Sequence, residues 1–326
     1  MNEIVLHVNL LDPTNASQQE ALGILGVNLI HAAYFQSVDH GFLSVLGQEL
    51  GLERIQIDFI ETSGSLFNGW KSKDLFIALV TCGFSEGVVL PHAGNYRPMN
   101  EVFYILPVVI EPGKFEQREP IHTEMLAAAS EHAHSERTIE TRRVHGMFCL
   151  SATESQSGDT SARLLSLSEL SVRSDGLLGE GFDVLVTPHH DLYKISSLVS
   201  RFTTEQVRFV MGISTLIKVL ADSYAELHGK ILEALSRLFT DNARIYVYPM
   251  ALEVLRTKLS PKQLADWKIS HTGELVQADE ITPPLPLTHL YAYLLASGLI
   301  EPLRVVKVKM RTETATRSEQ SPSAIQ

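Results

Sequence analysis

Three short apolar segments in the second half of the chain place the strongest limits on its fold. They are Asp183–Thr187 (DVLVT), Val207–Gly212 (VRFVMG) and Ala243–Tyr248 (ARIYVY), with amphipathic helical segments between them. Continuous apolar runs of this length are typical of strands that are buried on both faces of a sheet. Strands that alternate with helices over short connections pair in parallel through right-handed crossovers. The second half therefore predicts a parallel α/β arrangement with three layers, of the Rossmann-like kind.

The first half predicts a second lobe of mixed α/β type. Alternating or apolar runs predict strands at 3–10, 54–60, 87–90, 102–110 and 138–150, and helices are expected at 17–34, 41–50, 73–82 and 120–132. The strand at 138–150 is interpreted as an edge strand, because Arg142 and Arg143 interrupt its alternation. The helix at 17–34 opens on a capping-box pattern from Ser17 to Glu20. It is apolar nearly all round, so it is expected to be buried.

The 326 residues divide into two predicted domains. Residues 1–150 form the mixed α/β domain and residues 163–310 the parallel α/β domain. Between them, the segment 151–162 (SATESQSGDTSA) is poor in apolar residues and is predicted to be a linker or mobile loop. The tail 311–326 has little apolar surface to bury and is predicted to be disordered.

The charge balance and the absence of targeting signals exclude several classes of function. The formal net charge is −11, and residues 1–150 hold 18 acidic and 9 basic side chains, which disfavours nucleic acid as a partner. No apolar run reaches the roughly 18–20 residues of a membrane helix, and the N-terminus lacks the basic and apolar regions of a signal peptide. We therefore expect a soluble cytoplasmic protein with no membrane partner. Cys82 and Cys149 are expected to be buried reduced thiols.

Three segments carry a resemblance to a known group of proteins. They are ILGVNLIHAAYF (24–35), GKILEALSRLFTDNARIYVYP (229–249) and PLTHLYAYLLASGLIEPL (286–303). With them the chain resembles, over most of residues 1–304, an uncharacterised bacterial protein family whose members often carry the label TonB-dependent receptor. The sequence has neither an export signal nor a series of amphipathic strands of about 10 residues, so the label is not expected to apply. The resemblance supports the fold and implies no activity.

The junction after the first apolar strand is the most suggestive site. His189 and His190 follow this strand, and Asp191 and Lys194 lie at the start of the next helix. Ligands of open α/β sheets bind beyond the carboxyl ends of the strands, so either histidine could be a catalytic base or a ligand contact. The alternative is that Asp191 caps the helix and that both histidines are ordinary loop residues.

Two further loops join this candidate site. Gly212, Ser214 and Thr215 end the second apolar strand, and hydroxyl groups at a helix N-terminus can hold an anion or simply cap the helix. If the apolar strands are neighbours, this loop lies near His189 and His190. In the first half, Ser63 and Gly64 follow a predicted strand and could cradle a phosphate group, or form a polar turn.

A fourth loop and a histidine pair complete the candidates. His92 and Arg97 follow another strand and could face an anionic ligand, or form a surface turn. His132 and His134 lie two residues apart near a helix end, whereas metal pairs on a helix need a spacing of four. No metal site is predicted, and no cofactor is identified.

These observations favour a cytoplasmic protein that binds or converts a small anionic metabolite, with phosphorylated metabolites included, at the strand ends or between the lobes. The alternative is a non-catalytic scaffold or interaction protein that forms a homo-oligomer. A membrane receptor-associated protein, as the family label suggests, is the remote third. The chain contains no recognisable catalytic motif, so whether it is an enzyme stays open.

Overall fold

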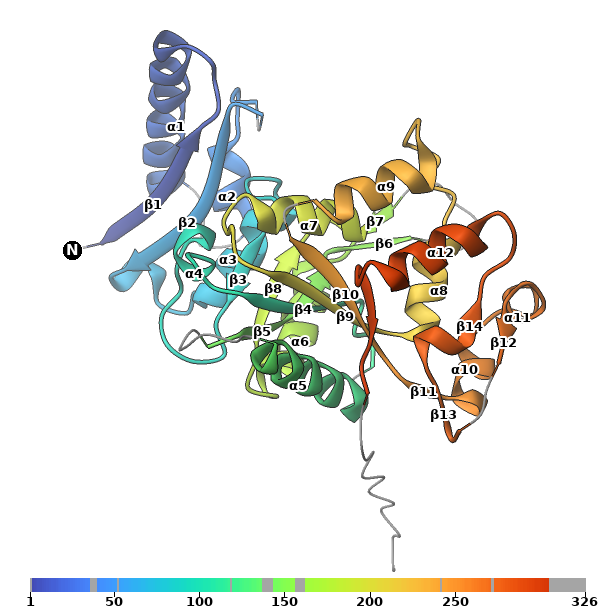
Figure 1. Cartoon of the computed structure of the whole chain (residues 1–326). Coiled ribbons are helices and arrows are strands. Elements are labelled where there is room, and N and C mark those ends of the chain that lie inside the picture. Colours follow the sequence, from blue (N-terminus) through green and yellow to red (C-terminus); the bar gives the residue numbers. More distant parts are fainter. Residues whose placement is uncertain are drawn as a thin grey trace, which may run out of the picture.

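The protein is a three-layer α/β structure. The computed structural model describes residues 2–35, 40–51, 53–117, 119–136, 143–155, 162–240, 242–270 and 273–304. In this part of the chain, helices cover both faces of a seven-stranded, mostly parallel sheet (Figure 1). The predicted α/β class and the predicted Rossmann-like three-layer arrangement are both confirmed.

The central sheet has the strand order β15-β10-β9-β4-β5-β8-β3. All neighbouring strands pair in parallel except β3, which is antiparallel to β8 at one edge. The strands are β3 (Val88–Leu90), β4 (Val108–Gly113), β5 (His145–Ser151), β8 (Asp183–Thr187), β9 (Val207–Gly212), β10 (Ala243–Tyr248) and β15 (Ile300–Pro302).

The parallel strands extend in two directions from the middle of the sheet. From β4 the chain continues to β5 and β8 on one side, and then to β9, β10 and β15 on the other. This is the order 3-2-1-4-5-6 of doubly wound nucleotide-binding sheets, and the direction reverses between β4 and β9. These two strands pair from Val108–Val207 to Ile110–Phe209, and among the described residues they do not pair beyond that point. The carboxyl ends of β4 and β9 therefore flank the topological switch point.

Two apolar cores lie on the two faces of the sheet. One core joins Val109, Phe148 and Val210 to the helices α3 (Ser72–Thr81), α5 (Pro120–Ser135) and α6 (Leu167–Leu178). The other joins Ile110 and Phe209 to α7 (Leu192–Ser200), α8 (Ile213–Ala221), α9 (Lys230–Leu238) and α12 (Leu287–Ala296). Figure 1 shows α5 on one side of the sheet and α7 and α9 on the other.

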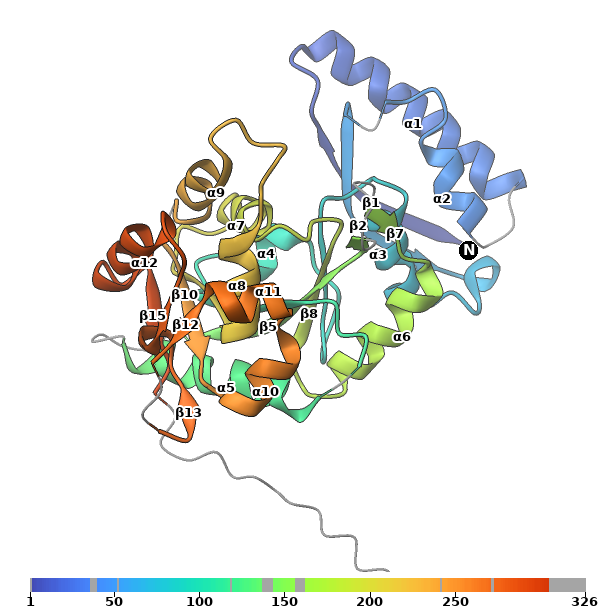
Figure 2. The same cartoon turned by 90° about the vertical axis from the view of Figure 1, so that its right-hand side faces the viewer.

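Smaller elements surround this body. β1 (Glu3–Leu10) and β2 (Ile55–Ser63) form an antiparallel pair, which with the long helix α1 stands apart from the central sheet (Figures 1 and 2). The other elements are α2 (His40–Leu46), η1 (Ser65–Phe67), α4 (Met99–Val102), β6 (Thr153–Ser155), β7 (Ala162–Leu164), β11 (Met250–Ala251), α10 (Leu252–Lys258), α11 (Pro261–Asp266), β12 (Lys268–Ile269), β13 (Leu275–Val276), η2 (Ala278–Glu280) and β14 (Ile281–Thr282).

Two strand predictions in the first half were wrong. The strand expected at 102–110 is β4 at Val108–Gly113, because Pro107 and the positive φ of Ile105 separate it from the helical turn α4. The strand expected at the edge is β5, which lies inside the sheet between β4 and β8. This strand begins at His145, so Arg143 precedes it and does not interrupt it. Arg142 lies outside the described residues.

The first helix differs from expectation in two ways. It is α1 (Asn15–Phe35), and its N-terminal backbone is capped by the Thr14 hydroxyl, which accepts a hydrogen bond from the Ser17 N–H at 3.2 Å. The capping box predicted to start at Ser17 was therefore wrong. The helix was also expected to be buried, but Val27 is 68% exposed, because α1 packs along one side only.

The central sheet takes strands from both sides of the predicted boundary at 151–162. β3, β4 and β5 precede this segment, and β8, β9, β10 and β15 follow it. The two predicted lobes thus share one sheet, while the domain division itself stays a prediction. Residues 156–161 of the predicted linker and the predicted tail 311–326 lie outside the described residues. Within the described part, no helix has both the length and the apolar composition needed to cross a bilayer.

Candidate functional site

A groove lies beside the carboxyl end of β8, where the sequence suggested a site. It has a volume of about 360 Å³, within the range of small-molecule pockets. Two of the nominated residues, His189 and Lys194, line it. The other lining residues are Glu86, Tyr193, Ser197, Leu198, Arg201 and Arg237.

Three cationic side chains and one carboxylate line this groove. Arg201 pairs with the Glu86 carboxylate. Lys194 pairs with Asp191 at 2.7 Å, and Arg237 with Glu233 at 2.6 Å. Asp191 and Glu233 are not lining residues, so two of the three cations have partners outside the groove. An arginine has five N–H donors and uses few of them in one such pair, so further donors are available to an anion.

The ring of Tyr193 holds two of these cations in place. The Lys194 ammonium lies 5.5 Å from the ring centroid and the Arg237 guanidinium 5.9 Å from it, both within the range of cation–π attraction. The Tyr193 hydroxyl donates a hydrogen bond to Glu226 at 3.1 Å, and the ring is buried. A rigid aromatic ring therefore positions charges that would otherwise be mobile on long side chains.

A second hollow adjoins the groove. It has a volume of about 200 Å³ and is lined by Ser197, Ser200, Arg201, Arg237 and Thr240. Arg201, Arg237 and Ser197 line both hollows, so the two hollows share these three side chains. Guanidinium groups combined with hydroxyl donors are well suited to phosphate oxygens.

The two adjacent histidines have different surroundings. Burial, followed by the nearby Lys194 ammonium, lowers the pKa of His189, so the ring that lines the groove is neutral at physiological pH. His190 is more exposed and lies 3.3 Å from the Asp191 carboxylate. Asp191 holds the N-cap position of α7, but its side chain makes no capping hydrogen bond and pairs with Lys194 instead.

The loop after β9 does not join this groove. Gly212 holds the N-cap position of α8, Ser214 is buried in the first turn, and Thr215 follows it. The expectation that this loop lies near His189 was wrong, because β4 and β5 separate β9 from β8 in the sheet. Both loops lie on the carboxyl edge, about 14 Å apart at the usual strand spacing of about 4.8 Å.

The remaining nominated residues lie in other places. Ser63 is the last residue of β2, where it pairs with Glu3 in the separate two-stranded sheet, and Gly64 follows the strand with a φ of 107°. His92 follows β3, which runs antiparallel to β8. It therefore lies beside the amino end of β8, whereas His189 lies beyond its carboxyl end. Arg97 is exposed in the loop beyond it.

His92 belongs to a cluster around Asp183, the first residue of β8. One Asp183 oxygen accepts the backbone N–H of His92 at 2.8 Å and lies 2.7 Å from its Nδ1. The other oxygen lies 3.1 Å from Nε2 of His145. Burial alone would raise the pKa of Asp183, but the contacts with His145 and His92 outweigh it and lower the pKa to about 2. These contacts connect the amino ends of β5 and β8 to the residues that follow β3.

A second candidate site, which the sequence did not indicate, lies at the switch point. Glu111 in β4 is 2% exposed, and its Oε1 lies 2.5 Å from Nδ1 of His122 in the first turn of α5. Within the described residues its other oxygen, Oε2, has no hydrogen-bond partner. Burial raises the pKa of Glu111 to about 7, even though the bond to His122 acts in the opposite direction.

Phe115 covers this pair. Its ring packs edge-on against His122 and Phe148, and it occupies the space where a Cβ on Gly113 would lie. His122 is partly exposed, whereas Glu111 is not. The arrangement can carry a proton between a buried carboxyl group and the surface near neutral pH.

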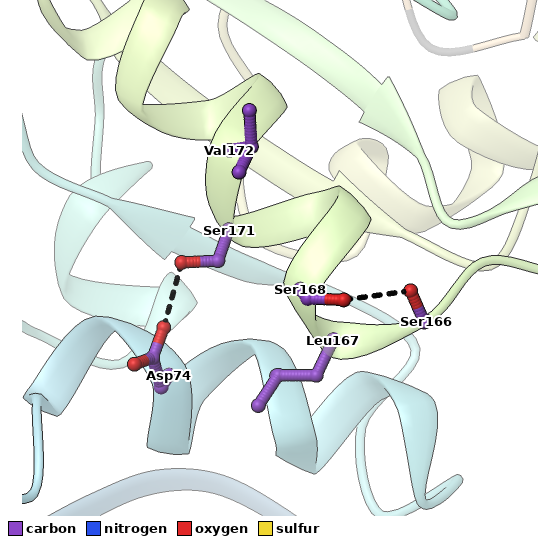
Figure 3. Close-up of a pocket in the computed structure, with 6 residues that line it drawn as sticks. All are labelled: Asp74, Ser166, Leu167, Ser168, Ser171 and Val172. Atoms are coloured by element: carbon purple, nitrogen blue, oxygen red, sulfur yellow. Dashed lines mark hydrogen bonds between the residues drawn. The ribbon is translucent and has the colours of Figure 1, made fainter.

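Figure 3 shows a third hollow, between α3 and the N-terminus of α6. It has a volume of about 390 Å³ and is lined by Asp74, Ser166, Leu167, Ser168, Ser171 and Val172. The Ser171 hydroxyl donates to Asp74 at 2.9 Å (Figure 3). The Glu169 carboxylate already accepts the Ser166 N–H and completes the capping box. With Asp74 in the first turn of α3 and Glu169 in the first turn of α6, little attraction remains for a further anion.

Comparison with known proteins finds no matching family model, no similar curated protein and no similar solved structure.

Proposed function

We propose that the protein binds a small metabolite bearing a phosphate group in the groove beside β8, with the phosphate between Arg201 and Arg237. The observation that carries this proposal is that these two arginines line both of the adjoining hollows, which serine and threonine side chains also line. Lys194 adds a third cation and His189 a neutral imidazole. The net charge of −11 repels anions in general, so anion binding would depend on the three cations at this groove and not on the overall charge.

Calorimetric titration with pyrophosphate and with a hexose phosphate tests this proposal. We expect the wild-type protein to bind at least one of them, and the double variant Arg201→Gln, Arg237→Gln to bind it at least about tenfold more weakly, since each charge-assisted hydrogen bond contributes about 1.5–3 kcal/mol. Arg256→Gln, on the exposed surface of α10, is the matched control. Unchanged affinity in the double variant, or no binding to the wild type at millimolar concentration, would exclude the groove as the site.

We propose self-association through α1 as a second candidate function. Its outer surface carries the exposed apolar side chains Leu22, Val27, Ile30, Tyr34 and Phe35. A Cβ built on Gly23 or Gly26 meets nothing within 4 Å, so this surface has no neighbour within the described part of the chain. Exposed apolar patches often mark protein–protein contacts. This observation favours the predicted homo-oligomer.

Light scattering of Val27→Lys, Ile30→Lys compared with the wild type tests self-association. These side chains are 68% and 62% exposed, so the free energy of unfolding should change by less than about 0.5 kcal/mol. If α1 mediates assembly, the wild type has a multiple of the monomer mass and the variant has the monomer mass. A monomeric wild type, or an assembly that persists in the variant, would rule out this surface.

A further inference from the structure

Three side chains that can ligate a metal lie together at the C-terminal end of α5, whereas His122 lies in the first turn of this helix. His132 and Glu136 are four residues apart at the C-terminal end of this helix, and Glu301 lies in β15. The Nε2 atom of His132 lies 2.8 Å from Oε1 of Glu301 and 3.5 Å from Oε1 of Glu136. One ligand atom from each of the three residues lies within 4.8 Å of the other two.

These separations are those of ligands around one ion. Ligand atoms that each lie about 2.0–2.2 Å from a tetrahedral zinc ion are about 3.4 Å from one another. The two distances from Nε2 lie on either side of that value. A spacing of four residues places His132 and Glu136 on one face of the helix, as metal-binding pairs require. Each of the three side chains is between 22% and 32% exposed, so solvent can reach the site.

The surrounding residues hold Glu136 in the orientation that a ligand needs. The Tyr246 hydroxyl donates to Glu136 Oε2 at 2.8 Å, which leaves Oε1 for the side of His132. Arg208, which is 1% exposed, donates from Nε to the Tyr246 hydroxyl at 3.1 Å, and its Nη2 lies 3.7 Å from the same Oε2. The ring of Tyr246 also packs edge-on against the His132 imidazole. Such supporting contacts orient ligands and increase metal affinity.

The two carboxylates of this cluster attract a cation to its centre. Two carboxylates face one imidazole nitrogen, and that nitrogen can offer a single proton to both. The Arg208 guanidinium compensates one charge, but on the far oxygen of Glu136. A divalent ion between the three ligand atoms would be attracted by both carboxylates.

We infer that His132, Glu136 and Glu301 bind one divalent transition-metal ion of the zinc class, with at least one coordination position open to solvent. One imidazole nitrogen and two carboxylate oxygens suit zinc, cobalt and manganese, with zinc the tightest of these three. The ion would join the end of α5 to the edge strand β15. This site is independent of the groove beside β8, and neither proposal needs the other.

Calorimetry of the untagged, chelator-treated full chain with zinc chloride and manganese chloride tests the inference. We expect one zinc ion per chain and weaker binding of manganese. His132→Gln and Glu301→Gln should each weaken zinc binding at least about tenfold, and Tyr246→Phe by about tenfold. His134→Gln and Glu131→Gln, both exposed on the same helix, are matched controls that should bind as the wild type does.

A second measurement needs no variant. In the wild-type protein, zinc should shift the imidazole NMR signals of His132 at one equivalent, before those of the other 12 histidines move. The inference is overturned if zinc does not bind at micromolar concentration, if another histidine responds first, or if binding survives in folded His132→Gln and Glu301→Gln.

Discussion

Replacing Glu111 by glutamine should make the protein more stable above neutral pH, by up to about 3 kcal/mol, since one unit of pKa is worth about 1.4 kcal/mol and the pKa of Glu111 is raised from 4.5 to about 7. The cause is burial, because the ionised carboxylate lies in β4 with one oxygen unpartnered among the described residues. Glutamine has nearly the same shape, can still bond to His122, and cannot ionise.

The pH dependence gives the sign of this effect. Because the pKa is raised in the folded state, the stability that Glu111 contributes is fully present below about pH 4.5 and is lost as the pH rises through about 7. Denaturant unfolding across this interval should therefore show a decline in the wild type that is absent from Glu111→Gln. Glu116→Gln, in the exposed segment that follows β4, serves as control and should retain the decline. If the free energies of unfolding of the wild type and of Glu111→Gln change with pH in the same way, Glu111 is not buried as described.

Replacing Asp183 by asparagine should have the opposite effect, a loss of about 1.5 kcal/mol at neutral pH after a discount for the partly exposed histidines around it. Its pKa is lowered from 3.8 to about 2, because the contacts with His145 and His92 outweigh burial. Asparagine keeps the size of the side chain but loses the charge that both histidines approach.

The sign again follows from the direction of the pKa change. A lowered folded-state pKa means that the stability is present above about pH 3.8 and is lost as the pH falls through about 2. Thermal unfolding should thus show a gap between wild type and Asp183→Asn at neutral pH that narrows in acid. Asp266→Asn, exposed on α11, should show no such gap. If Asp183→Asn unfolds at the wild-type temperature at neutral pH, the cluster contributes nothing to stability.

The strands that the sequence located correctly are those with the simplest signal. β8, β9 and β10 have the predicted bounds because buried parallel strands are continuous apolar runs with clear turns at both ends. Their order in the sheet could not be predicted in the same way. Two strands from the first half, β4 and β5, insert between β8 and β9, and a pairing between distant segments leaves no local pattern in either.

Because the strand β4 was predicted in the wrong place, the Glu111–His122 pair at the switch point could not be identified from the sequence. With the strand predicted at 102–110, Glu111 was assigned to a loop, where a charged residue is common and does not indicate a site. The available signal was a glutamate directly after Val108-Val109-Ile110 and before Pro112-Gly113, since a charge at the end of a buried parallel strand often marks a site.

Two of the residues that line the groove could be predicted from the sequence, and the two arginines could not. His189 and Lys194 follow a strand end, so their position at the carboxyl edge follows from the α/β pattern. From the sequence, the spacing of four residues between Glu233 and Arg237 predicts only an ion pair on the exposed side of a helix. That pair forms at 2.6 Å, but the same guanidinium also lines the groove. Arg201 lies at the far end of α7, and only tertiary packing brings it to Arg237.

The most direct test of the anion-binding groove is an NMR titration of the arginine side-chain Nε–Hε signals with pyrophosphate. The account predicts that Arg201 and Arg237 shift together and saturate with one binding constant, while Arg256 does not move. If these two signals stay unchanged, or if every arginine shifts in proportion to the added salt, the groove beside β8 is not an anion site.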